Sequence, residues 1–583
     1  MRKGIGVSPG VAVGTAYCIH EVFVRPQTRP LEAAEVAGEL RRFEKAVKKS
    51  LADLRALAQK VASQVGKEPA AVFRAHQAIL RDPAFTTKMR QAIETQRQPA
   101  EAALHDVLAE YTAIFDRTHD EYLKQRLADV RDVILRLSEH LSPMLANDPA
   151  ADSDRLIVVA QELLPSQVVA LGGKRLAGIV TQSGGATSHA AILARGQGIP
   201  AVSGVRDILR QVTNGDLVVV DGSSGYVVVN PDPETESAYR KLQREYFQLQ
   251  DVLAENRDAP ARLADGEAIE LLANINGLTD AQAATAVGAA GVGLFRTEYL
   301  FLTHPDVPDE EEQLAAYREI LATCPQRRIT IRTLDLGGDK TIPYLGRQRE
   351  ANPFMGWRSI RLSFEHPEFF LTQVRAILRA GGEEHAEVRM LFPMITTLEE
   401  MRRVRSMVNR ARKRLQAEGK PVGPVPLGLM VEVPAAAVCI DALLSVVDFV
   451  SIGSNDLVQY LMAADRDNPK VSHLCQPLSP AVLRVLRRVI ESCHKAGKPV
   501  TLCGEMAGLP RAFALLVGMG LRSMSMSPAL LPGIKELASH LTAEQTRKML
   551  RRAMKLKTTE QVLTYLRDEV DRLAPNLKLL DSM

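Results

Sequence analysis

Eight short apolar segments alternate with longer amphipathic stretches in the C-terminal half of this 583-residue chain, and this alternation constrains the fold more than any other feature. The short segments have the length and composition of buried strands, and the longer stretches carry apolar residues at helical spacing. The candidate strands are residues 269–273, 291–295, 329–333, 388–394, 427–431, 449–452, 500–503 and 523–526. Eight strand–helix repeats over about 315 residues predict a TIM-type (β/α)8 barrel, which we place at residues 261–583.

Polar residues fall at or just after the C-terminal ends of these candidate strands. Active sites of such barrels are built on this face. Contact with solvent is enough to explain one polar residue at a strand end. It does not explain why several arginines and carboxylates converge on one rim. The converging residues are Asn274, Arg296, Thr297, Glu298, Arg332, Asp335, Glu432, Asn455, Asp456, Cys503 and Glu505.

Four arginines near this rim are candidate anion clamps. Guanidinium groups match phosphate and carboxylate oxygens in a bidentate geometry. The four arginines and a neighbouring lysine are Arg296, Arg332, Arg358, Arg466 and Lys340. One arginine alone is usually a surface residue, whereas four on one rim predict a small polyanionic substrate.

Two carboxylates and a thiol complete the candidate site. Glu432 and Asp456 follow the fifth and sixth strands, so they can face one another across the mouth. Ligands that offer only oxygen favour a hard divalent cation, most simply Mg2+. Cys503 follows the seventh strand, and a thiol with an ordinary pKa of about 8.5 can donate a proton at neutral pH. The alternative for Cys503 is inert packing in an apolar strand.

A separate segment, residues 184–195, carries a histidine suited to covalent phosphorylation. Two glycines precede Thr187 and Ser188, which are helix-capping residues, and an apolar run follows. His189 is therefore predicted in the first turn of a helix, where free N–H groups and the helix dipole favour an anion. A lone histidine in this position is more often a cap without chemistry, and the barrel residues are what favour the reactive interpretation.

The N-terminal half predicts an α/β domain with an inserted helical bundle. Residues 1–22 and 147–232 contain short Val-rich strands, whereas residues 23–146 carry apolar residues at the spacing of about four helices. Residues 233–260 are a charged helical connector with little apolar surface. The predicted architecture is therefore multidomain α/β, with the barrel as the last domain.

Composition excludes several other classes of protein. The chain is 46% hydrophobic and 24% charged with a net charge of +4, so nothing favours nucleic acid as a partner. Its six cysteines lack Cys-x-x-Cys spacing, which argues against a zinc site and for a reducing cytoplasm. The N-terminus lacks a signal-peptide pattern, and charged residues and a proline interrupt the longest apolar stretch, so no membrane span is expected.

With these residues established, the chain resembles Enzyme I of the sugar phosphotransferase system, the phosphoenolpyruvate–protein phosphotransferases, from about residue 4 to about residue 570. The motifs that carry the resemblance are residues 184–189, 335–340, 350–358 and 448–460. The first and last are also similar to pyruvate phosphate dikinase and phosphoenolpyruvate synthase. Those enzymes require an additional ATP-grasp domain, for which this chain has no room.

The resemblance implies a role for each candidate residue. His189 is the phosphorylated residue; Arg296, Arg332, Arg358 and Arg466, with Lys340, hold phosphoenolpyruvate; Asn455 contacts substrate; Glu432 and Asp456 bind Mg2+; and Cys503 protonates the enolate that becomes pyruvate. The α/β domain is then a swivelling phosphohistidine domain, and the connector is its hinge. The helical insertion docks the phosphocarrier protein HPr, and the barrel forms a cytoplasmic homodimer.

The helical insertion departs from some relatives in its charge. Residues 31–146 contain eighteen basic and seventeen acidic residues, so the insertion lacks the acidic surface that some relatives present to HPr. We therefore expect a more apolar contact through Phe73, Ile79 and Leu80. His76 is expected to be a structural or docking residue and not a second phosphorylation site.

Other functions remain open from the sequence. One is a pyruvate-forming barrel enzyme that does not use His189. Another is a non-enzymatic regulator, which is expected to lack one of Glu432, Asp456, Arg466 and Cys503, although all four are present. The sequence also leaves open whether the phosphoryl group serves sugar uptake or a nitrogen-related regulatory branch.

Overall fold

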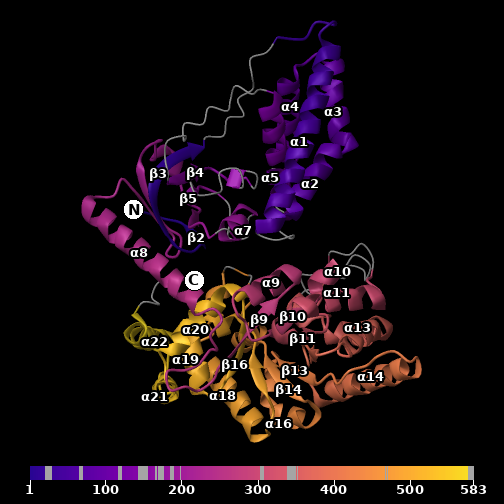
Figure 1. The fold of residues 1–583 in the computed structure, drawn as a ribbon, viewed down its shortest axis with the longest axis vertical. Coiled ribbons are helices and arrows are strands. Elements are labelled where there is room, and N and C mark those ends of the chain that lie inside the picture. Colours follow the sequence, from indigo (N-terminus) through magenta and orange to yellow (C-terminus); the bar gives the residue numbers. More distant parts are fainter. Residues whose placement is uncertain are drawn as a thin grey trace. The chain divides into compact units, whose positions relative to one another are not determined.

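The computed structural model of the chain contains two compact units that divide between residues 248 and 249, inside helix α8 (Pro233–Glu255) (Figure 1). It describes residues 1–19, 29–64, 70–115, 121–141, 155–164, 167–168, 176–183, 189–196, 198–302, 307–337, 350, 352–466, 468 and 470–575. Within these ranges, no helix combines the length and the apolar character needed to cross a membrane.

The first unit is built on an eight-stranded mixed sheet. Its strands are β1 (Arg2–Lys3), β2 (Ile5–Ser8), β3 (Val11–Ile19), β4 (Leu156–Ala160), β5 (Leu176–Thr181), β6 (Ala201–Ser203), β7 (Leu217–Asp221) and β8 (Tyr226–Val229). The spatial order is β1-β8-β7-β3-β4-β5-β6-β2, and β3, β4, β5 and β6 pair in parallel. Strand β4 is buried along its whole length, which explains its uninterrupted apolar sequence. Helix α7 (His189–Gly196) lies between β5 and β6 in the chain.

The described residues between β3 and β4 form an inserted bundle of five helices. Thr15 in β3 pairs with Leu156 in β4, so the sheet continues directly across the insertion. The helices are α1 (Val36–Gln64), α2 (Ala71–Arg81), α3 (Pro83–Glu94), α4 (Ala100–Phe115) and α5 (Glu121–Leu141). The expected number was about four; the structure has five because Asp82 ends α2 and its carboxylate caps α3 at the N–H of Ala84, with Pro83 as the first residue of α3.

Two of the three side chains that the sequence predicts at a docking surface lie inside this bundle, whereas the third, Ile79, is half-buried. Phe73 and Leu80 on α2 are at most 1% exposed, so the prediction that they contact HPr is wrong. His76 on the same face is fully buried, with Nε2 3.1 Å from Asp129 Oδ1 and Nδ1 3.8 Å from Asp132 Oδ2 on α5. The apolar stripe of α2 therefore packs into its own bundle, and His76 is a structural residue.

Replacing His76 by Ala is expected to destabilise the bundle by about 2–3 kcal/mol, because Asp129 and Asp132 lose a buried polar partner. Chemical denaturation followed by circular dichroism measures the change. His105→Ala on α4 is the matched control, since that imidazole is 28% exposed, and it should cost less than about 0.5 kcal/mol. Equal costs for the two variants would contradict a structural role specific to His76.

The second unit is a closed barrel of eight parallel strands. They are β9 (Glu270–Ile275), β10 (Val292–Arg296), β11 (Arg328–Arg332), β12 (Glu387–Phe392), β13 (Leu427–Val431), β14 (Phe449–Ile452), β15 (Val500–Leu502) and β16 (Ser523–Met526). Each strand pairs with the next, and β16 pairs with β9 to close the barrel. The eight predicted strands are confirmed, and their ends differ from the prediction by at most two residues.

Helices surround these strands (Figure 1). They are α9 (Leu278–Ala286), α10 (Glu298–Leu302), α11 (Glu310–Thr323), α12 (Ile360–Glu365), α13 (Pro367–Ala380), α14 (Leu398–Ala417), α15 (Pro434–Val438), α16 (Ile440–Leu443), α17 (Ser454–Met462), α18 (Pro480–Lys495), α19 (Pro510–Gly518), α20 (Leu531–Ser539), α21 (Ala543–Ala553) and α22 (Thr559–Leu573). A small cluster is separate from the large core beneath these helices and contains Leu294, Leu391, Met430, Phe449 and Cys503. Cys503 therefore packs among apolar side chains of four different strands.

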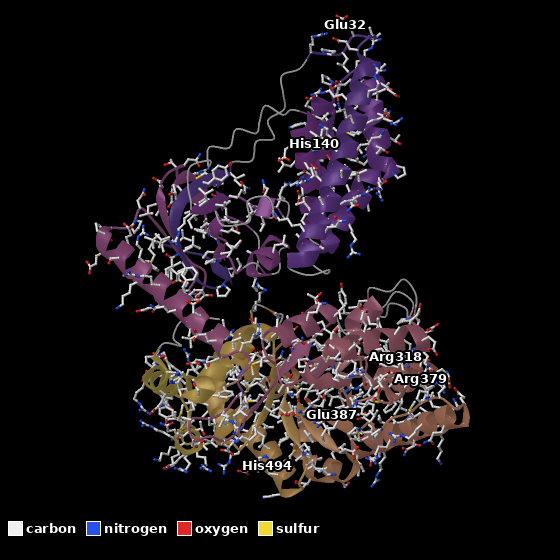
Figure 2. All side chains as sticks on the ribbon, in the orientation of Figure 1. Glu32, His140, Arg318, Arg379, Glu387 and His494 are labelled. Atoms are coloured by element: carbon white, nitrogen blue, oxygen red, sulfur yellow. The ribbon has the colours of Figure 1, made fainter. Side chains whose placement is uncertain are left out.

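Ion pairs connect neighbouring helices of the barrel. Arg379 on α13 lies 2.6 Å from both Glu310 and Glu311 on α11. Arg318 on α11 lies 2.6 Å from Glu383, which follows α13. Figure 2 labels Arg318 and Arg379 on these adjacent helices. The pairs fix one helix against the next, and they leave these arginines neutralised.

Candidate active site

The barrel brings most of the predicted site residues to one end of the sheet. Because the strands are parallel, their C-terminal ends meet at the same mouth. Arg296 and Arg332 are the last residues of β10 and β11, whereas Glu432 and Cys503 directly follow β13 and β15. Asp456 lies in the first turn of α17, close behind the end of β14.

Six charged side chains form one connected series of alternating sign at this mouth, which we call the charge chain. In order of contact they are Glu298, Arg332, Asp335, Arg358, Asp456 and Arg466. Successive nitrogen–oxygen distances are 3.0, 3.0, 2.9, 3.3 and 2.9 Å. The first five side chains are at most 9% exposed and the Arg466 side chain is 39% exposed, so one end is buried and the other meets solvent.

The centre of the charge chain is a bidentate pair. Nη2 of Arg358 lies 2.9 Å from both carboxylate oxygens of Asp335, and Nε donates to Oδ1 at 3.3 Å, so two nitrogens of the guanidinium hold the carboxylate. Gly337 makes this approach possible, because its φ is +120° and a Cβ there would lie 2.4 Å from the Cβ of Arg358. The next residues of the motif, 338–340, lie outside the described residues. Lys340 is one of them.

Burial sets the charge states of these groups. Although burial disfavours a charged guanidinium, the carboxylates of Glu298 and Asp335 raise the pKa of Arg332 well above its usual range. Burial likewise works against the Asp335 carboxylate, but Arg332 and Arg358 hold its pKa well below its usual range. Both ions therefore stay charged at neutral pH, and each compensates the desolvation of the other.

Arg296 differs from the arginines of the charge chain because it has no ion pair among the described residues. Its Nη1 lies 3.4 Å from Asn276 Oδ1, and the side chain is half-buried. Burial, followed by the like charge of Arg332, lowers the pKa of Arg296. A partly desolvated cation without a counter-ion favours the binding of an external anion.

Glu432 and Asp456 are the two predicted carboxylate ligands at the mouth, and the oxygens of Asp456 accept from Arg358 and Arg466 in this structure. The fully buried Glu432 accepts a hydrogen bond of 2.6 Å from the Met394 N–H through Oε1. Its other oxygen faces Gly453, where a Cβ would lie only 3.0 Å away, so the glycine keeps Oε2 uncovered. Burial, and then the like charge of Asp456, raises the pKa of Glu432.

These features fit a divalent cation, since a positive ion at this position would relieve both the burial and the repulsion of the two carboxylates. The described residues contain no group of three or more His, Cys, Asp and Glu side chains that could hold a metal alone. A cation bound by Glu432 and Asp456 therefore needs further oxygens from substrate or water.

The Cys503 thiol is buried between two hydrogen-bonding groups. The Ser451 hydroxyl donates to Sγ at 3.1 Å, and Sγ lies 3.6 Å from the Ile452 carbonyl oxygen, which can accept the S–H. Burial raises the pKa of the thiol, against the smaller effect of the Ser451 hydrogen bond. Asn274 donates to the Cys503 carbonyl oxygen at 2.8 Å and fixes the backbone. The thiol is therefore protonated at neutral pH and held in place.

Two other predicted residues have different surroundings. Asn455 exchanges two hydrogen bonds with Glu505, at 3.1 and 2.9 Å, on the exposed rim. Helix α7 begins at His189, so the backbone of His189 lies in the first turn. The His189 side chain and residues 184–188 lie outside the described residues.

Three residues to which the sequence analysis assigns no role organise the site. Glu298 accepts hydrogen bonds from Arg332 at 3.0 Å and from the Asp335 N–H at 2.9 Å. The Tyr460 hydroxyl lies 3.3 Å from Nη1 of Arg358, and Ser451 contacts the thiol. The signal for Glu298 is its place two residues after a strand that ends in arginine, whereas nothing in the sequence singles out Ser451.

Three family models of PEP-utilising enzymes match the chain. They describe an N-terminal domain over residues 3–126, a mobile domain over residues 153–225 and a PEP-binding domain over residues 250–543. A phosphoenolpyruvate-protein phosphotransferase from Bacillus sp. (strain S) is 39% identical over 97% of this chain and 97% of its own length. The chain belongs to the phosphoenolpyruvate-protein phosphotransferase family.

A second curated relative matches over a similar extent, and a solved structure matches part of the chain. The phosphoenolpyruvate-protein phosphotransferase from Listeria innocua is 38% identical and aligns over 96% of this chain and 98% of its own. An NMR structure of an Enzyme I protein is 34% identical over 42% of this chain and 99% of that chain, with a TM-score of 0.35. The resemblance seen in the sequence is confirmed, and the charge chain lies in the part of the molecule that matches the PEP-binding domain.

Replacing Arg358 by Lys keeps the positive charge but removes the fork that binds both oxygens of Asp335. We expect the barrel to lose about 1–3 kcal/mol of stability and to bind phosphoenolpyruvate more weakly. Thermal unfolding with and without phosphoenolpyruvate measures both effects. Arg484→Lys on α18 is the matched control, because that arginine is exposed and has no ion pair among the described residues. A wild-type response from Arg358→Lys would contradict the role of the bidentate pair.

Proposed function

We propose that the chain transfers the phosphoryl group of phosphoenolpyruvate to His189 and then to a histidine of the phosphocarrier protein HPr, and releases pyruvate. The observation that carries this proposal is a buried cationic mouth that also contains a protonated thiol. An anion clamp alone suits many ligands, whereas a clamp beside a proton donor suits an enolate product. Membership of the phosphoenolpyruvate-protein phosphotransferase family supports the same reaction.

The arginines of the mouth bind phosphoenolpyruvate in this proposal. Arg296, which has no counter-ion among the described residues, supplies free positive charge for the substrate. Arg332 and Arg358 are held rigidly by their carboxylate partners, so their remaining N–H groups are oriented before substrate arrives. We assign the phosphoryl and carboxylate groups to these three arginines, with Arg466, Lys340 and Asn455 at the outer rim.

Glu432 and Asp456 are the residues proposed to hold Mg2+, which when bound supplies positive charge against the developing negative charge of the transferred group. The transition state of phosphoryl transfer is loose, so positioning and electrostatic stabilisation provide most of the catalysis. Among the groups of the protein, the guanidinium groups supply this electrostatic stabilisation.

The chemical steps balance without a further reactant. A nitrogen of the neutral His189 imidazole attacks phosphorus, so that a P–N bond forms and the P–O bond to the enolate breaks. The Cys503 thiol donates its proton to the enolate carbon, which forms the methyl group of pyruvate. The resulting thiolate keeps the Ser451 hydrogen bond and regains a proton from water.

His189 must serve two sites in turn, the barrel mouth and the acceptor histidine of HPr. We propose that helix α8 accommodates this movement, because the division between the two units falls within it. We further propose that the helical insertion docks HPr and that the barrel forms a homodimer. Transfer to a carrier of a nitrogen-related regulatory branch is a second candidate, for which the site would be the same.

Ser451→Ala tests the proton donor through pH. The hydroxyl lowers the pKa of the Cys503 thiol by stabilising the thiolate, so its removal should raise that pKa. A donor works only while protonated, and activity is lost as pH rises through its pKa; the variant should therefore retain pyruvate formation to higher pH. Rates measured from pH 6 to 11, about 2.5 units on each side of an ordinary thiol pKa of about 8.5, decide this. Ser445→Ala, on the exposed surface, should leave the profile unchanged, and an unmoved profile in Ser451→Ala would exclude Cys503 as the donor.

Metal binding is tested apart from catalysis. Addition of Mg2+ to chelator-treated protein should raise the unfolding temperature of the barrel, because the cation offsets the repulsion between Glu432 and Asp456. Glu432→Gln or Asp456→Asn should abolish this increase. Glu505→Gln, which neutralises an exposed carboxylate on the same rim, should retain it. The same increase in all variants would place the metal elsewhere.

Incubation with radiolabelled phosphoenolpyruvate and Mg2+, followed by mapping of acid-labile phosphate, tests the proposed function as a whole. The label should be found on His189, disappear in His189→Ala and persist in His105→Ala. Label on any other residue would overturn the assignment. Pyruvate formation that survives in His189→Ala would favour a barrel enzyme that does not use this histidine.

A further inference from the structure

Helix α14 carries a long run of positive charge in which, among the described residues, Arg405 alone has a carboxylate partner. Between Glu400 and Glu418 the sequence contains six arginines and one lysine but no acidic residue. The helix begins at a capping box of Thr397 and Glu400, and its apolar residues pack into the barrel at three- and four-residue spacing. The opposite face forms an open groove of about 830 Å3, lined by five cations: Arg402, Arg405, Arg410, Lys413 and Arg414.

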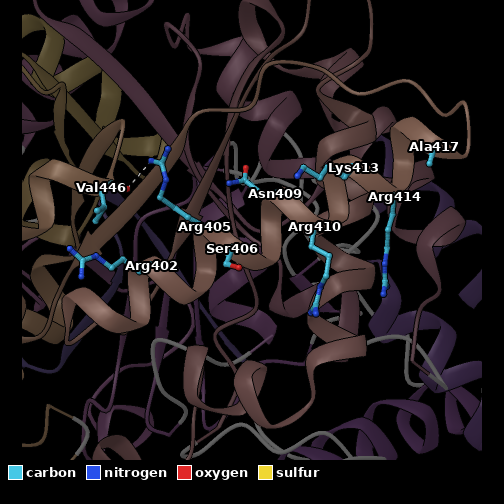
Figure 3. Close-up of a pocket in the computed structure, with 9 residues that line it drawn as sticks. All are labelled: Arg402, Arg405, Ser406, Asn409, Arg410, Lys413, Arg414, Ala417 and Val446. Carbon is cyan, nitrogen blue, oxygen red and sulfur yellow. Dashed lines mark hydrogen bonds between the residues drawn. The ribbon is translucent and has the colours of Figure 1, made fainter.

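Four of these cations form what we call the cation row. Its members are Arg402, Arg410, Lys413 and Arg414, all exposed and without an ion pair among the described residues. Arg405 is different, because it donates to the Val446 carbonyl oxygen at 2.9 Å, the dashed line in Figure 3, and lies 3.8 Å from the Asp448 carboxylate. Arg410 and Arg414 project in the same direction, one turn apart (Figure 3).

The cation row is unfavourable for the helix itself. Like charges at three- and four-residue spacing destabilise a helix, whereas opposite charges stabilise it. Exposed helices elsewhere in this chain use the stabilising pattern, as in Arg487 with Glu491 and Lys548 with Glu544. The helix dipole favours cations in the last turn, near Arg414, but not Arg402 in the second. An external anion would provide the counter-charge that the described residues do not give to the cation row.

The geometry selects among anionic ligands. A small phosphate compound needs donors that converge from several elements, but these donors are strung along one helix. Single-stranded nucleic acid favours aromatic stacking platforms, and no aromatic residue lines the groove. A membrane-surface helix inserts its apolar face, which in α14 is already buried in the barrel. An acidic protein surface satisfies the remaining requirements.

We propose that the cation row is a docking surface for a partner protein that presents an acidic α-helix. Carboxylates on one face of such a helix repeat every three or four residues, the same period as the cations of α14. Arg402 and Arg414 are about 18 Å apart along the helix axis, so the contact spans three turns. This surface lies on the outside of the barrel and is separate from the helical insertion to which we assign HPr.

Fluorescence anisotropy with a labelled synthetic peptide tests the proposal on the full chain. The probe is a helical peptide with glutamates at every third or fourth position, and its partner probe has the same composition with the glutamates distributed around the helix. The peptide with aligned glutamates should bind about tenfold more tightly than the peptide with distributed glutamates, and added salt should weaken its binding. Equal binding of the two peptides would overturn the proposal.

A charge-reversal variant identifies the surface. Arg402→Glu, Arg410→Glu and Arg414→Glu combined should weaken binding by about tenfold or more. The matched control combines Arg484→Glu, Arg547→Glu and Arg551→Glu, which make the same change of charge on exposed residues of α18 and α21. It should retain binding, and both variants should keep the circular dichroism and phosphoryl transfer of the wild type. Equal loss in the control would show that net charge and not α14 is responsible.

Competing occupants give distinct results. Single-stranded RNA, phosphatidylserine vesicles or tripolyphosphate that binds α14 more tightly than the acidic peptide would replace the proposal with that ligand. A change in sedimentation caused by the α14 variant alone would assign the surface to a second copy of this chain. Phosphorylation of His189 can be measured whether or not the acidic peptide binds. A negative result for the cation row therefore does not test the proposed function.

Discussion

The alternation of charge in the barrel mouth is the constraint on which the rest of this structure depends. A buried guanidinium or carboxylate is costly alone, and the charge chain from Glu298 to Arg466 offsets that cost by pairing each ion with the next. Two consequences follow. The arginines that face the mouth are fixed before any ligand arrives, and Arg296, which lacks a partner among the described residues, remains the cation available to an incoming anion.

The proposed proton donor and the proposed cation ligands are positioned by different means. Cys503 lies in an apolar cluster, where burial keeps the thiol protonated and the Ser451 hydroxyl orients it. Glu432 lies where burial and like charge make its ionised form unfavourable, which a bound cation reverses. One mouth thus contains a cationic clamp, a neutral acid and a pair of carboxylates, each set by its own surroundings.

Much of this arrangement could be predicted from the sequence. Buried parallel strands such as β13 give uninterrupted apolar runs, so their positions and the residues after them, including Glu432, were identifiable. The pairing of Arg332 with Glu298 was not, because a carboxylate after a strand has the same sequence signal whether solvated or buried. Phe73 was assigned to the wrong surface, since an apolar stripe does not reveal what covers it. The cation row of α14 was overlooked because the overall charge of +4 averages it away.

Calorimetric titration of phosphoenolpyruvate and Mg2+ into His189→Ala separates binding from transfer and tests the central claim most directly. If the barrel mouth alone holds the substrate, this variant should bind one phosphoenolpyruvate per chain. Adding Arg332→Gln should then weaken binding by about tenfold or more, and adding Arg484→Gln should not. Loss of binding in His189→Ala itself, or unchanged affinity with Arg332→Gln, would contradict the account.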